Sequence, residues 1–167
     1  GIDIDNDGVI DLQLYDINQD GVIDASEQAD PNHKDLYVEI DWMALHTPLT
    51  AALDMVVESF INAPVANPDG TPGIRLHLQI DEEAAVHSDN IAFLPGTAPA
   101  TGGAADFDVV KASHFGTANE RTNSNSANIL EAKRQAFRYA LFAHNLLGKD
   151  GTSGIAANGV LLSGGCV

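Results

Sequence analysis

The sequence is short of basic residues, and this shortage is its most informative absence. Eight lysines and arginines face 24 aspartates and glutamates, which gives a formal net charge of −16. Phosphates of nucleic acid and anionic membrane surfaces repel such a chain, so we expect neither as a partner. The apolar runs are also well below the roughly 20 residues that cross a bilayer, and we expect no membrane span.

A single cysteine, Cys166, excludes a disulfide bond within the chain. A buried or incidental thiol is the simplest interpretation, while a free thiol and a link to another chain stay open. Hydrophobic residues make up 44% of the sequence and charged residues 19%, which is typical of a globular protein and not of a disordered one.

The acidic residues are concentrated near one end, because 12 of the 24 lie in the first 41 positions. Residues 16–27 match the twelve-residue EF-hand calcium loop at every defining position. Residues 3–12 repeat this pattern 13 positions earlier, but Leu14 stands where the closing carboxylate belongs. Asp16 is the nearest group that can complete the first shell. We therefore expect the first loop to bind calcium more weakly, unless the two sites share ligands.

The spacing supplies the six to eight oxygens that calcium takes. Side chains at loop positions one, three and five converge on the ion, and Gly21 makes the turn that a β-carbon resists. A backbone carbonyl, a carboxylate at position nine and a bidentate glutamate complete the shell. The expected ligands of two calcium sites are Asp3, Asp5, Asp7, Val9 and Asp11, and then Asp16, Asn18, Asp20, Val22, Asp24 and Glu27.

These tandem loops resemble the calcium repeats of thrombospondin type 3 segments and dockerins. The residues between Asp11 and Asp16 are too few for the two helices of a regulatory EF-hand pair. The resemblance implies structural sites of modest affinity, which suit the millimolar calcium outside cells. We therefore expect an extracellular, secreted and processed chain. We also expect that loss of a ligand such as Asp20 loosens residues 1–30 and leaves the remainder folded.

The remainder, residues 34–167, predicts an α/β (α+β) fold with a small open, mostly parallel sheet. Residues 35–42 and 73–80 alternate apolar and polar side chains, as half-buried strands do. Between them, apolar residues recur at helical spacing from Leu49 to Phe60, after Thr47 or Thr50 as the cap. Strand, helix and strand in this order predict a right-handed crossover between parallel strands.

The alternation also predicts which side chains face the core. We expect Leu36, Val38, Ile40 and Trp42 inward in the first strand, with Tyr37, Glu39 and Asp41 on the other face, and Ile74, Leu76, Leu78 and Ile80 inward in the second. Further along, we expect a surface excursion over 82–105, a short strand over 107–115 and a helix from Ser126 or Asn128 to Ala136. Residues 137–143 predict a strand, with a continuation of the helix as the alternative, and residues 159–163 predict a last short strand.

Four stretches, residues 34–43, 73–78, 137–144 and 153–156, resemble secreted bacterial and archaeal zinc metalloproteases of the metzincin type. The resemblance implies an open sheet with one crossover helix, as in the upper subdomain of such a protease. In that family, the stretch similar to 153–156 precedes a strand and then a helix with the zinc-binding His-Glu-x-x-His motif.

This sequence departs from the family at that point, because it ends without the motif. None of its histidines, His33, His46, His77, His87, His114 and His144, stands in such a pattern. His77 and His87 flank an acidic triplet, but their spacing matches no ligand motif, so we do not expect zinc in this chain. Gly-x-Ser-x-Gly is also absent, and no catalytic residue can be assigned.

Three functional interpretations follow. The favoured one is an extracellular, calcium-stabilised, metalloprotease-like domain without catalytic machinery. An alternative is the N-terminal fragment of an active secreted zinc metalloprotease. The other is a structural subunit of an extracellular filament or surface assembly, with copies of itself or other extracellular proteins as partners.

Overall fold

The computed structural model describes residues 1–14, 16–17, 21–22, 27–92 and 104–145. This part of the chain forms an α+β fold around a small open sheet of three parallel strands, which confirms the predicted fold class at this level. The strands are β1 (Asp35–Met43), β2 (Arg75–Ala85) and β5 (Phe137–Phe142), in the spatial order β2-β1-β5. The predicted strand after Ala136 is thereby confirmed.

The connection from β1 to β2 runs through helix α1 (Thr50–Ile61), as predicted. The predicted cap is wrong, because neither Thr47 nor Thr50 caps the helix. Leu49 occupies the N-cap position with extended backbone angles, and no side chain accepts a hydrogen bond there. Thr50 is already the first helical residue, so its hydroxyl cannot act from the flanking position that a cap requires.

The second helical group consists of α2 (Phe107–His114), α3 (Ala118–Thr122) and α4 (Ser126–Ala136). Helix α4 confirms the prediction, but the strand predicted over 107–115 is wrong. The side chain of Asp106 accepts a hydrogen bond from the amide of Asp108 and so starts a helix there. Helix α3 was not predicted, although Thr117 and Glu120 form a capping box at its start.

The predicted excursion over 82–105 contains more regular structure than expected. Strand β2 continues to Ala85, and β3 (Asn90–Ala92) pairs in parallel with β4 (Ala104–Asp106) to form a second, two-stranded sheet. The strand predicted over 159–163 lies outside the described residues. Among the described helices, none has the length and apolar character needed to cross a membrane.

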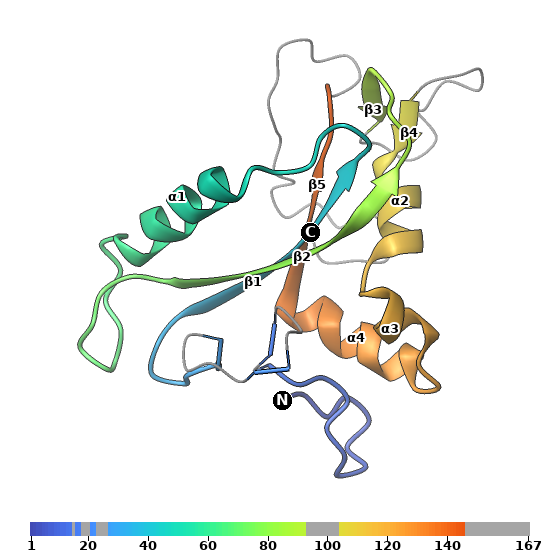
Figure 1. Ribbon diagram of the computed structural model, residues 1–167. Helices are drawn as coiled ribbons and strands as arrows, with labels where there is room; N and C mark the ends of the chain where they lie inside the picture. The colour runs from blue at the N-terminus through green and yellow to red at the C-terminus, as the bar shows by residue number, and fades with distance from the viewer. Residues whose placement is uncertain (15, 18–20, 23–26, 93–103, 146–167) are drawn as a thin grey trace.

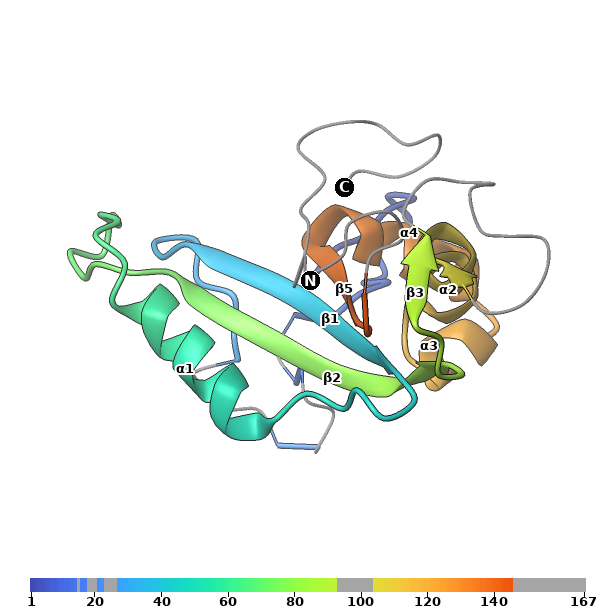
Figure 2. The same ribbon diagram turned by 90° about the horizontal axis from the view of Figure 1, so that it is seen from above.

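Figures 1 and 2 show α1 on one side of the three-stranded sheet and α2, α3 and α4 on the other. The side that faces α2–α4 is the one predicted as polar, and there Tyr37, Glu39 and Asp41 are all buried. The opposite, apolar face is less well covered, since Ile80 is 44% exposed and α1 has no fully buried residue. The inward placement of Ile80 is therefore wrong, because α1 covers this face only in part.

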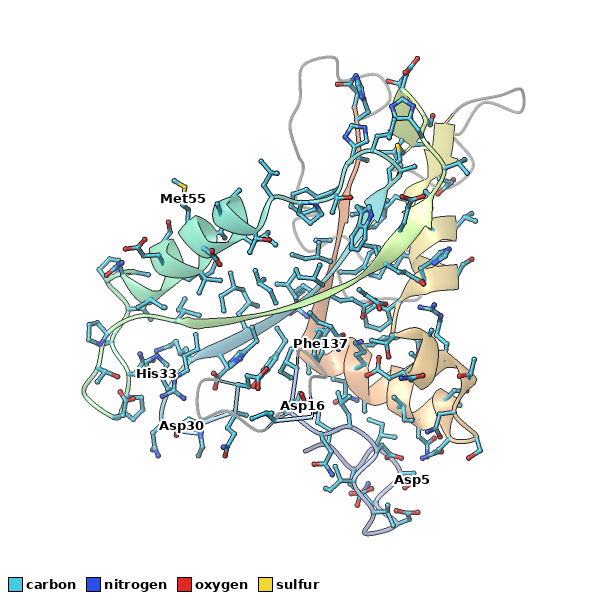
Figure 3. All side chains as sticks on the ribbon, viewed as in Figure 1. Asp5, Asp16, Asp30, His33, Met55 and Phe137 are labelled. Atoms are coloured by element: carbon cyan, nitrogen blue, oxygen red, sulfur yellow. The ribbon has the colours of Figure 1, made fainter. Side chains whose placement is uncertain are left out.

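The N-terminal loops and the sheet share one hydrophobic cluster. Leu12 and Ile17 are buried together with Tyr37, Phe115 and Phe137. Figure 3 shows Asp16 close to Phe137, at the end of the sheet where β5 begins. The division into a repeat segment (1–30) and a body (34–167) stays a prediction, but the two segments are packed against each other.

Candidate functional site

The first acidic loop brings three of its five predicted ligands together. One carboxylate oxygen from each of Asp3, Asp5 and Asp11 lies within 4.8 Å of the others. The ends of the loop are joined by backbone hydrogen bonds between Ile2 and Leu12, at 2.8 and 3.1 Å. Asp7 lies outside this group, and its Oδ1 accepts a hydrogen bond from the amide of Val9 at 2.8 Å. Val9 can contribute only its backbone carbonyl, since its side chain has no oxygen.

The two loops share a turn geometry at their glycines. Gly8 has a φ of 87° and Gly21 a φ of 83°, a left-handed conformation that side chains with a β-carbon rarely adopt. The amide of Gly8 donates to Asp3 Oδ2 at 3.0 Å, and the amide of Gly21 donates to Asp16 Oδ2 at 3.2 Å. The first and sixth positions of both loops are therefore linked by the same hydrogen bond.

The remaining oxygen of each first-position aspartate is buried and unsatisfied. Within the described part of the chain, neither Asp3 Oδ1 nor Asp16 Oδ1 has a hydrogen-bond partner. A buried carboxylate oxygen without a partner is unfavourable by about 1–3 kcal/mol or more. A cation removes this penalty, and an all-oxygen donor set of this kind fits calcium.

The first loop rests on the start of α4. Asn128 Nδ2 donates to Asp5 Oδ2, and Asn125 Nδ2 donates to Asp11 Oδ1, both at 2.7 Å. Figure 3 shows Asp5 on the loop next to the α3–α4 region. Partners of this kind orient the carboxylates that hold a metal ion. The sequence contains no local signal for them, because they lie more than 110 positions from the aspartates.

The second loop is described only in part. Asp16, Val22 and Glu27 belong to the described residues, whereas the predicted ligands Asn18, Asp20 and Asp24 lie outside them. Gln79 Nε2 of β2 donates to the carbonyl of Ile17 at 3.2 Å, which connects this loop to the sheet.

A buried charge network lies between the sheet and α4. Lys133 is fully buried, and its Nζ is 2.7 Å from Glu39 Oε2, 2.7 Å from Glu120 Oε2 and 2.5 Å from Gln79 Oε1. Glu39, also fully buried, accepts two further hydrogen bonds from the amide of Gly116 at 2.8 and 3.0 Å. The buried ammonium of Lys133 therefore has three oxygen partners, as burial of a charge requires.

Two more carboxyl groups adjoin this network. Asp41 accepts a hydrogen bond from the Tyr139 hydroxyl at 2.7 Å. One carboxylate oxygen from each of Glu39, Asp41 and Asp81 lies within 4.8 Å of the others. Burial raises the pKa of Glu39 to about 7, against the opposing effects of Lys133 and Gly116. Burial, followed by the negative charges of Asp41 and Glu82, raises the pKa of Asp81 to about 6. The interior therefore holds protons at pH values where exposed carboxyls are ionised.

The raised pKa of Asp81 predicts a pH-dependent share of stability. Because the folded state binds this proton more tightly than the unfolded state, the contribution is fully present below the ordinary pKa of 3.8 and is lost as the pH rises through about 6. Asp81→Asn removes that loss and should raise the free energy of unfolding at pH 8 by about 1–2 kcal/mol relative to the wild type. This free energy is smaller than the one that the whole pKa shift corresponds to, because Asp81 retains some solvent contact.

Urea unfolding of both proteins between pH 4 and 8, in saturating calcium, measures this difference. Glu83→Gln is the matched control, since Glu83 lies on the same strand with an exposed side chain. It should leave the pH dependence of the wild type unchanged. If the free energy of unfolding depends on pH equally in the wild type and in Asp81→Asn, the raised pKa of Asp81 is contradicted.

No protein-family model, no curated protein and no solved structure matches this chain. The likenesses to calcium repeats and to metzincin proteases therefore stay predictions. The fold and the geometry define an α+β protein whose N-terminal acidic loop offers a group of oxygens suited to a hard cation.

Proposed function

We propose that this chain is an extracellular calcium-binding protein in which calcium stabilises a metalloprotease-like fold that has no catalytic machinery of its own. The observation that carries the proposal is the pair of buried, unpartnered oxygens on Asp3 and Asp16. They occupy equivalent positions in two loops with the same glycine turn, and calcium supplies the partner that both lack.

The donor set favours calcium over other metal ions. Asp3, Asp5 and Asp11 offer only oxygen, whereas transition metals prefer sites that include nitrogen or sulfur. Magnesium requires near-ideal octahedral geometry and retains its waters, which an irregular loop of carboxylates and carbonyls does not favour. Without a carboxylate at Leu14 the first site is the weaker one, and such affinities suit extracellular calcium concentrations.

The metalloprotease-like character of the body rests on the resemblance of its sequence. A parent gene that continues into a His-Glu-x-x-His segment would make this chain the N-terminal part of an active zinc protease. Sequencing the complete transcript distinguishes that alternative from the proposal.

A second candidate function, a subunit of an extracellular assembly, is favoured by the surface of α1. Met55 is 69% exposed, Ile61 53% and the preceding Leu49 76%. Figure 3 shows Met55 pointing away from the sheet. Burial of these exposed apolar side chains against another protein would stabilise an assembly, and the proposed partners are copies of the chain or other extracellular proteins.

Native mass spectrometry with calcium and then with a chelator tests both functions. We expect a monomer with two calcium ions. Asp3→Asn should lose the calcium ion of the first loop, and Asp16→Asn should lose that of the second loop. If Asp16 also completes the shell of the first loop, Asp16→Asn should weaken calcium binding there as well. Asp54→Asn, an exposed aspartate on α1, is the control and should retain both ions.

Retention of two ions by both Asp3→Asn and Asp16→Asn would contradict the calcium assignment. Polymers that form with calcium and dissociate in chelator would instead support the assembly function.

A further inference from the structure

Three histidines that are far apart in the sequence meet at one edge of the sheet. His46 follows the end of β1, His87 follows the end of β2, and His144 follows the end of β5. Because these three strands are parallel, their carboxyl ends lie at the same edge. The N-terminal loop packs near the start of β5, so the histidines lie at the other end of the sheet from it.

The three rings are in mutual contact. His46 stacks on His87 with ring centroids 5.4 Å apart, and His144 meets both rings edge-on at 5.1 and 5.5 Å. One nitrogen from each ring lies within 4.8 Å of the others. Among the described residues, this group contains no carboxylate or thiol, so it offers three imidazole nitrogens.

The distances suit a tetrahedral metal site. Zinc binds imidazole nitrogen at about 2.0–2.1 Å, which places two nitrogens of a tetrahedron about 3.4 Å apart. His144 Nδ1 and His46 Nε2 are 3.3 Å apart. A nitrogen of His87 lies within 4.8 Å of the other two, and its exposed side chain has the freedom to turn closer and complete the set.

The backbone next to each histidine is tied to a neighbouring segment. The amide of His46 donates to the carbonyl of Met43 at 2.9 Å, and that of Ala44 donates to Ala85 at 2.8 Å. The amide of Ile91 donates to the carbonyl of Asn145, directly after His144, at 2.7 Å. The Ala44–Ala85 bond joins the chain after β1 to the end of β2, and the Ile91–Asn145 bond joins β3 to the chain after β5. The segments that carry the histidines are therefore tied down at this edge before any ion binds.

We propose that His46, His87 and His144 form a binding site for a divalent transition metal ion of the zinc type. Imidazole nitrogen suits zinc, copper and nickel, and it does not suit calcium. Three protein ligands leave one tetrahedral position for water or another ligand. This site is separate from the acidic loops and extends the metal chemistry of the chain beyond the proposed calcium binding.

The test is a zinc titration of the full chain, first stripped of transition metals and then kept in saturating calcium, in competition with a zinc-binding chromophore. We expect one zinc ion per chain. His46→Ala, His87→Ala and His144→Ala should each weaken binding by more than about 100-fold, because loss of a ligand exceeds the 10- to 100-fold effect of losing only an orienting partner.

Two controls separate this site from other binding. His33→Ala removes a histidine that bonds to Asp69 outside the group, and Asp3→Asn alters the acidic loop. Both should retain the zinc affinity of the wild type. Circular dichroism establishes that each variant is folded.

Imidazole NMR of the wild type provides a readout that needs no substitution. Zinc should shift the ring signals of His46, His87 and His144 and leave those of the buried His77 and of His114 in place. Absence of stoichiometric zinc binding, or equal affinity in the wild type and the three alanine variants, would overturn the proposal. Zinc-induced shifts confined to other histidines would also overturn it.

Discussion

Lys133→Met should lower the free energy of unfolding by about 3–5 kcal/mol, the typical effect of removing one partner from a buried ion pair. Glu39 would stay fully buried beside the sheet, with only the amide of Gly116 and no cation to oppose its charge. Glu120 and Gln79 would lose the same ammonium partner. The loss should be smaller at pH 5 than at pH 8, because Glu39, with a pKa of about 7, is then protonated.

Urea unfolding in saturating calcium measures the effect of Lys133→Met, and two further variants identify its cause. Arg134→Met changes the next residue of α4, whose exposed ion pair with Glu131 contributes at most about 1 kcal/mol. The double variant Glu39→Gln/Lys133→Met should recover part of the loss, since no buried charge then lacks a partner. A loss below about 1 kcal/mol for Lys133→Met would mean that the network does not stabilise the fold.

Calcium removal should destabilise the sheet as well as the N-terminal loops. At a free calcium concentration 100 times the dissociation constant, one site contributes about 2.7 kcal/mol to the free energy of unfolding. Leu12 and Ile17 share a buried cluster with Tyr37 and Phe137, so loosening the loops should expose part of the core. The sequence-based expectation is that the remainder of the chain stays folded, and this cluster adds that it does so with a lower free energy of unfolding.

Trp42, the single tryptophan, lies on β1 and reports on the sheet through its fluorescence. Its unfolding midpoint in urea should fall when calcium is replaced by a chelator and should recover when calcium is returned. In Asp3→Asn and Asp16→Asn the response should be smaller, and magnesium at the same concentration should give little recovery. A Trp42 midpoint independent of calcium would show that the loops do not support the sheet.

The periodicity of apolar residues predicted helices and strands correctly where burial of one face is the main stabilising interaction. The alternation in β1 and β2 and the long apolar period of α1 predicted a parallel strand-helix-strand unit, and Ser126–Ala136 and Phe137–Phe142 were also predicted. Prediction of residues 107–115 failed because a short apolar run fits both a strand and a helix, and the capping bond at Asp106 decides between them. The face of Glu39 and Asp41 was taken as the outer one because alternation separates two faces without showing what covers each.

The sequence by itself led to the proposal of two calcium loops, because the expected ligands of each loop lie within twelve successive residues and their spacing matches the coordination of one ion. It also determined the parallel arrangement of β1 and β2 through the helix between them. Only the tertiary structure decided that Lys133 neutralises Glu39 and that His46, His87 and His144 meet. These contacts join segments that are distant in the chain. Periodicity shows which side of a helix or strand is apolar, but it does not show which other segment packs against that side.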